Sequence, residues 1–95
     1  MITLEDCIAF SGLTEEEVLA IAEHEHVPEI AAAALAEHLL QQTGGADKIR
    51  RMMVEDIRLA LARNDKTHAR HLLHALRHFL AMHRDAVLPL SATRV

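Results

Sequence analysis

The chain has no tryptophan and no tyrosine, and its 95 residues include only two phenylalanines and one cysteine. Without large aromatic side chains, the core has to be built from Leu, Ile, Val, Met and many Ala residues. The single Cys7 cannot form a disulfide within the chain, so a disulfide-stabilised secreted module is excluded. A domain of this length buries only about two-thirds of the surface that its unfolded chain exposes, so association with a second copy would add to a small stability margin.

Long apolar runs are also missing. The longest stretch of low polarity, residues 30–36, is far shorter than the roughly 20 residues that cross a bilayer. The first residues show no basic stretch followed by an apolar run and a small-residue cleavage site. We therefore expect a cytoplasmic protein without a membrane segment.

Basic residues are absent from the first 45 positions, where nine acidic residues carry a formal charge of −9. All ten Lys and Arg residues follow, together with five acidic residues, which leaves the second part at +5 and the whole chain at −4. If the two halves lie beside each other in one molecule, each softens the field of the other. The other interpretation is that the acidic half of one copy meets the basic half of a second copy.

Helix signals occur throughout the chain, and no segment alternates with the period of two that is typical of a β-strand. Segments 3–6 and 14–17 have the form of N-terminal capping boxes, and Gly44-Gly45 has the form of a helix end. The helices are expected at about residues 4–10, 15–26, 29–42, 47–63 and 67–84.

These elements predict an all-α fold, a compact bundle of four main helices plus a short N-terminal helix. The short turn at residues 64–66 predicts that the last two helices form an antiparallel hairpin. The helix over 29–42 is nearly apolar all round and is expected at the centre. A single domain is predicted over residues 1–88, followed by a flexible C-terminal tail at 89–95.

Met52 and Leu59 lie one heptad apart and about 100° or more from the main apolar face of their helix. A second apolar strip on one helix indicates a second contact surface. It predicts either an interface with another protein molecule or an ordinary contact with the first helix or the tail.

Histidine is several times more frequent than usual, with eight residues, five of them in the last helix. His71, His74 and His78 fall within ~60° of one another, roughly opposite the leucines of that helix. This spacing lets one helix offer two imidazoles to zinc, copper or nickel, so the three residues are candidate metal ligands. Because no carboxylate stands beside them in the helix, the alternative is a polar stripe that faces solvent or a second copy. His83 lies among the leucines, which is typical of a core or helix-end histidine.

No motif indicates catalysis. Cys7 follows two acidic residues, and nearby carboxylates oppose formation of the thiolate that a nucleophile needs. The Glu-x-x-His unit at residues 23–26 occurs once, whereas a di-iron bundle uses two such units and two further glutamates. A nucleophile-elbow motif, a phosphate loop and a dinucleotide glycine pattern are all missing. The sequence therefore predicts a protein that is not an enzyme.

Nucleic-acid binding is not favoured either. The helix over 29–42 follows a helix and a tight corner, as in a helix-turn-helix, but it offers Ala, Leu and Glu where base reading needs Arg, Lys, Asn or Gln. Arg70, Arg77 and Arg84 form a basic stripe one heptad apart on the last helix. The acidic half of the chain would repel phosphate over most approaches to this stripe.

The stretch from Leu4 to Leu40, with its Gly-Leu-Thr-Glu-Glu-Glu start and His-Val-Pro-Glu corner, resembles short uncharacterised helical proteins of bacteria. This resemblance implies no activity and no functional residue. The composition and charge pattern predict a small interaction or regulatory protein that forms a homo-oligomer, in the simplest case a dimer, or binds another protein. The alternative prediction is a protein that binds a metal or cofactor through its histidines.

Overall fold

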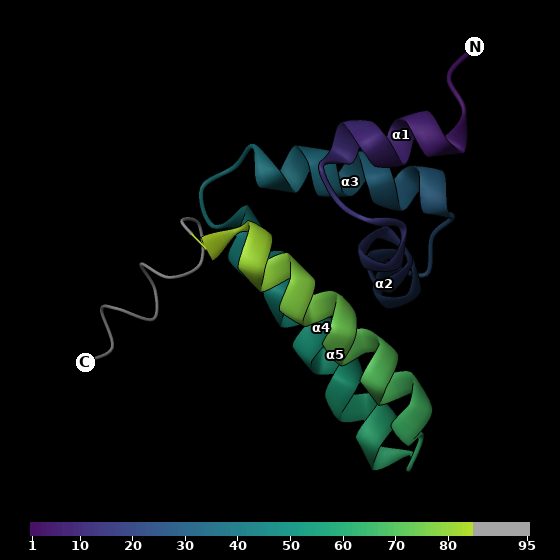
Figure 1. The fold of residues 1–95 in the computed structure, drawn as a ribbon, viewed down its shortest axis with the longest axis vertical. Helices are drawn as coiled ribbons and strands as arrows, with labels where there is room; N and C mark the ends of the chain where they lie inside the picture. Colours follow the sequence, from purple (N-terminus) through teal and green to yellow (C-terminus); the bar gives the residue numbers. More distant parts are fainter. Residues whose placement is uncertain (85–95) are drawn as a thin grey trace.

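The computed structural model describes residues 1–84, which form an all-helical structure (Figure 1). The five helices are α1 (Leu4–Ser11), α2 (Glu15–Glu25), α3 (Glu29–Leu40), α4 (Gly45–Ala62) and α5 (Lys66–Met82). Each predicted helix is present, with its ends within about two residues of the predicted ones. The predicted tail at 89–95 and the domain limit at residue 88 lie outside the described residues.

The first two helices begin where the sequence predicts, because their capping groups are local. The Thr14 hydroxyl accepts a hydrogen bond from the backbone N–H of Glu17 at 3.2 Å, and the Glu17 carboxylate accepts one from the Thr14 N–H at 2.9 Å. Thr3 and Asp6 form the same capping box at the start of α1. Such caps satisfy backbone donors that a helix start leaves without a partner.

Helix α3 is central, as predicted, and packs against α1, α2 and α4. Helices α4 and α5 form the antiparallel hairpin, which has the most extensive packing in the molecule (Figure 1). The core lies between helices α1–α3 and the hairpin, and it includes Ile21, Ile49 and Phe79, which are fully buried. Helix α2 lies against one flank of the hairpin, and α1–α3 leave its other flank uncovered (Figure 1).

The corner between α3 and α4 depends on two glycines with different roles. Gly44 has a φ of +80°, which favours glycine, and a Cβ there would meet nothing within 4 Å. Gly45 is helical, but a Cβ there would lie 1.6 Å from the carbonyl oxygen of Leu39. The backbones of α3 and α4 therefore approach each other as closely as only glycine permits.

None of the helices within residues 1–84 combines the length and the apolar character that crossing a membrane requires.

Candidate functional site

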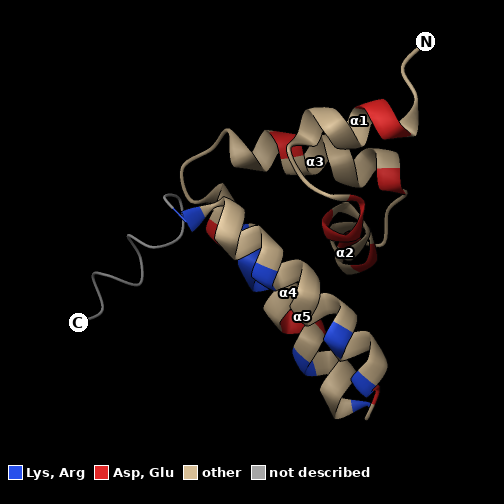
Figure 2. Ribbon diagram, viewed as in Figure 1, with Lys and Arg blue, Asp and Glu red and all other residues tan. Residues whose placement is uncertain are grey.

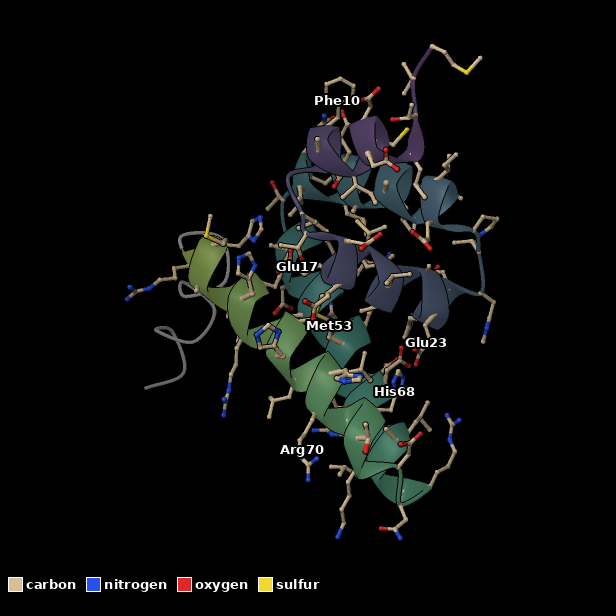
Figure 3. The ribbon with its side chains drawn as sticks, turned by 45° about the vertical axis from the view of Figure 1, so that its right-hand side comes forward. Phe10, Glu17, Glu23, Met53, His68 and Arg70 are labelled. Carbon is tan, nitrogen blue, oxygen red and sulfur yellow. The ribbon has the colours of Figure 1, made fainter. Side chains whose placement is uncertain are left out.

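Glutamates of α2 meet histidines of α5 where α2 packs on the hairpin. Glu23 and His68 point toward each other in Figure 3. The contacts join His68 Nε2 to Glu23 Oε2 at 2.8 Å, His74 Nδ1 to Glu16 Oε2 at 3.3 Å and His78 Nδ1 to Glu17 Oε2 at 2.8 Å. Because an ionised carboxylate can only accept, the imidazole nitrogen donates in each contact. The histidine stripe formed by His71, His74 and His78 is therefore not purely solvated, because His74 and His78 bind glutamates of the acidic helix α2.

Glu17 is the buried member of this set, with only 1% of its surface exposed. One of its carboxylate oxygens accepts from the Thr14 backbone N–H and the other from His78. A buried carboxylate is costly unless its oxygens have donors, and here both oxygens have one. The same side chain thus caps α2 and ties it to α5.

His24 makes a comparable contact between α2 and α4. Its Nε2 lies 2.8 Å from Glu55 Oε1, and its Nδ1 lies 2.8 Å from Glu25 Oε2. Both ring nitrogens can donate at once only when the imidazole is protonated. The hydrogen bond to Glu55 accordingly raises the pKa of His24 above 6.5, against the opposing effect of partial burial.

Asp56, on the buried side of α4, is only 8% exposed, and its Oδ2 oxygen has no hydrogen-bond partner. Burial raises the pKa of this carboxyl above 3.8, and nearby His24 partly opposes the rise. Asp56 is thus a buried acid that the fold leaves incompletely satisfied.

The charged residues are segregated in space as well as along the chain. Helices α1–α3 carry acidic residues and no Lys or Arg, whereas the hairpin carries the described Lys and Arg together with a few acidic residues (Figure 2). Within residues 1–84, every ion pair between two helices joins a histidine to a glutamate. The arginine ion pairs there lie inside α4, where Arg50 and Arg51 contact Asp47 at 2.7 and 3.3 Å. In this part of the chain, Lys and Arg therefore form no ion pair between the acidic helices and the hairpin.

A groove of about 820 Å³ runs between α2 and α5 and continues to the corner before α3. Its lining combines an apolar floor with acidic and imidazole side chains and includes no Lys or Arg. The lining residues are Glu16, Leu19, Ala20, Ala22, Glu23, Val27, Pro28, Glu29, His68, His71, Leu72 and Ala75. A concave apolar site with a few polar groups is the usual form of a binding site.

Of the three candidate metal ligands, His71 lines this groove, while His74 and His78 bind glutamates of α2. Within residues 1–84, no group of three or more His, Cys, Asp or Glu side chains is arranged to hold a metal ion. The metal site at His71, His74 and His78 therefore remains a prediction from the sequence, and the arrangement of these side chains adds no support for it. The carboxylates beside His74 and His78 cannot be recognised from the sequence of α5, because they come from α2, 58 and 61 residues away in the chain.

The predicted apolar strip is divided by the fold. Met52 is only 6% exposed and belongs to the core, whereas Leu59 is 51% exposed. Met52 therefore takes part in ordinary packing within the molecule, and Leu59 alone remains available at the surface.

Two other predicted side chains have structural positions. His83 follows the end of α5, where its ring stacks on Phe79 at 4.4 Å and its Nδ1 donates to the Phe79 carbonyl oxygen at 3.0 Å. This agrees with a helix-end histidine. Cys7 is a free thiol, partly buried against the core.

Comparison of the chain with protein-family models, curated proteins and solved structures gives no match.

Proposed function

We propose that this protein is a small, non-enzymatic interaction protein whose copies associate with one another. The observation that carries the proposal is the ion-pair pattern of the described residues, in which imidazoles, and not Lys or Arg, join the acidic helices to the hairpin. We further propose a cytoplasmic location, because a lone free thiol such as Cys7 stays reduced there.

This pattern leaves strong charges of both signs available to a partner. An imidazole is charged only when it is protonated, so it is not a permanent counter-charge for a glutamate as Lys or Arg would be. Arginine and lysine are permanent charges at neutral pH, and they lie on the hairpin, apart from the acidic helices (Figure 2). Within residues 1–84, no Lys or Arg ion pair joins the helices. The basic side chains of a second copy can therefore approach the acidic helices α1–α3 without breaking one.

Exposed apolar side chains on both parts of the molecule support the same proposal. They include Phe10, Leu19 and Ile30 on the acidic helices and Leu59, Leu61 and Leu73 on the hairpin. Covering such side chains contributes about 25 cal/mol for each Å² of apolar surface removed from water, which offsets part of the entropy that association costs. A domain with so small a core benefits directly from this burial.

Sedimentation equilibrium from low to high micromolar concentration tests the proposal. We expect reversible association that weakens when salt is raised to roughly 0.5 M, because the contributing charges are exposed. A strict monomer at every concentration in dilute salt would overturn it.

A further inference from the structure

The outer edge of α2 presents a leucine between two glutamates. Glu16, Leu19 and Glu23 are spaced by three and four residues, so they lie within ~60° of one another on the helix. Leu19 is 43% exposed, and all three side chains line the groove between α2 and α5. We call these three residues the acidic edge.

The outer edge of α5 presents the same arrangement with the opposite charge. Arg70, Leu73 and Arg77 are also spaced by three and four residues, and Leu73 is 38% exposed. Arg70 points away from α2 in Figure 3, and neither arginine forms an ion pair within residues 1–84. We call these three residues the cationic edge.

We infer that the acidic edge of one copy packs against the cationic edge of a second copy. This inference rests on the proposed self-association and names the two surfaces that form the contact. Leu73 of one copy lies against Leu19 of the other, and the arginines on either side of Leu73 bind the glutamates on either side of Leu19.

The dimensions of the two edges agree. In each edge the charged residues are seven positions apart, which corresponds to about 10.5 Å along a helix. Because the two spacings are equal, both arginines of one copy can meet both glutamates of a second copy at the same time.

The histidine contacts leave the two glutamates able to bind a second donor. Glu16 Oε2 contacts His74 and Glu23 Oε2 contacts His68, but a carboxylate has about four acceptor sites. An arginine from another copy can bind the remaining sites in the bidentate geometry that guanidinium and carboxylate groups favour. The contact between copies therefore adds to the contacts within one copy and does not replace them.

Charge also selects between the possible pairings of copies. Two acidic edges or two cationic edges would repel each other, whereas an acidic edge against a cationic edge attracts. This pairing is head-to-tail, so a pair of copies retains one free edge of each kind and continues into a ring or an open chain.

Two variants disrupt the edges separately. Leu19→Arg adds a positive charge within the acidic edge, and Arg70→Glu with Arg77→Glu reverses the charge of the cationic edge. Both changes affect exposed side chains, so thermal unfolding followed by circular dichroism should match that of the wild type. We expect each variant to associate at least about ten-fold more weakly than the wild type in sedimentation equilibrium.

Matched controls carry the same charge changes elsewhere. Ile30→Arg alters an exposed apolar residue of α3 that does not line the groove. Lys48→Glu with Arg63→Glu reverses two exposed charges near the two ends of α4, and neither residue lines the groove. Both controls should associate like the wild type.

Mixing the two edge variants is the decisive measurement. The Leu19→Arg chain retains its cationic edge and the Arg70→Glu, Arg77→Glu chain retains its acidic edge, so the mixture should form a one-to-one complex and nothing larger. If Leu19→Arg associates as strongly as the wild type, or if the mixture forms no complex, this inference is overturned while the proposed function stands. Loss of association only in the arginine variant also overturns it, because the cationic edge then meets an acidic surface of the second copy other than the acidic edge. A wild type that stays monomeric overturns both proposals.

Discussion

The Oε2 oxygen of Glu17, in the first turn of α2, lies 2.8 Å from Nδ1 of His78, in the last part of α5. The two residues are 61 positions apart in the chain, and the glutamate is almost completely buried. This contact is the best protected of those between α2 and α5, since the other two join exposed side chains.

Replacing His78 with Ala removes a donor from the buried Glu17 carboxylate, so we expect the free energy of unfolding to fall by about 1 to 2 kcal/mol. His74→Ala is the matched control, because its contact with Glu16 is longer and exposed, and it should cost less than about 0.5 kcal/mol. Urea denaturation followed by far-ultraviolet circular dichroism measures both. Equal losses in the two variants would contradict the importance of the buried contact.

The stability of the fold should depend on pH through His24. The hydrogen bond to Glu55 raises the pKa of His24, so the folded protein binds this proton more tightly than the unfolded chain. The resulting stabilisation is fully present below pH about 6.5 and is lost as the pH rises through the raised pKa. Glu55→Gln should therefore reduce the fall in melting temperature between about pH 6 and pH 8, while Glu5→Gln should not. An unchanged fall in Glu55→Gln would show that another group causes it.

Neutralising Asp56 should stabilise the protein at neutral pH. Burial raises the pKa of its carboxyl, so ionisation of Asp56 costs free energy in the folded state, and Asp56→Asn removes this cost with little change in volume. We expect a gain of about 1 kcal/mol near pH 7 that disappears in acid, where Asp56 binds a proton. Asp47→Asn in the same helix should instead lose stability, because Asp47 pairs with Arg50 and Arg51. Thermal unfolding at two pH values tests this, and a loss in Asp56→Asn at neutral pH would contradict it.

The two glycines between α3 and α4 should respond differently to substitution. Gly44→Ala places a side chain in open space at positive φ and should cost about 1 kcal/mol. Gly45→Ala drives a methyl group into the backbone of Leu39, which cannot move without separating α3 from α4, so its cost should be at least about 3 kcal/mol. Urea denaturation compares the two variants. Similar costs would mean that the corner relaxes around the new methyl group.

Zinc titration tests whether the histidine stripe of α5 is a metal site. His74 and His78 already bind glutamates, and residues 1–84 contain no cluster of metal-ligating side chains. We therefore expect the wild type and a variant with Ala at residues 71, 74 and 78 to bind zinc equally weakly in calorimetry of tag-free protein. Tighter binding by the wild type, by about ten-fold or more, would restore the metal hypothesis.

The candidate surfaces were only partly predictable. The spacing of Arg70 and Arg77 and the clustering of histidines on one face of α5 follow from the helical period, which the sequence contains. Met52 and Leu59 share that period as well, yet the fold buries one and exposes the other. A helical period tells which side chains lie on the same face, but not what that face contacts.

The sequence by itself determined where the helices begin and end and that the last two form a hairpin. These features depend on capping residues, glycines and turn lengths within a few positions of each other, and their physics is local. Only the tertiary structure decided that the acidic helix α2 lies against the histidines of α5 and that the arginines remain outside this contact. Those contacts join residues 45 to 61 positions apart, and they depend on how the apolar faces of five helices pack together, which no single segment contains.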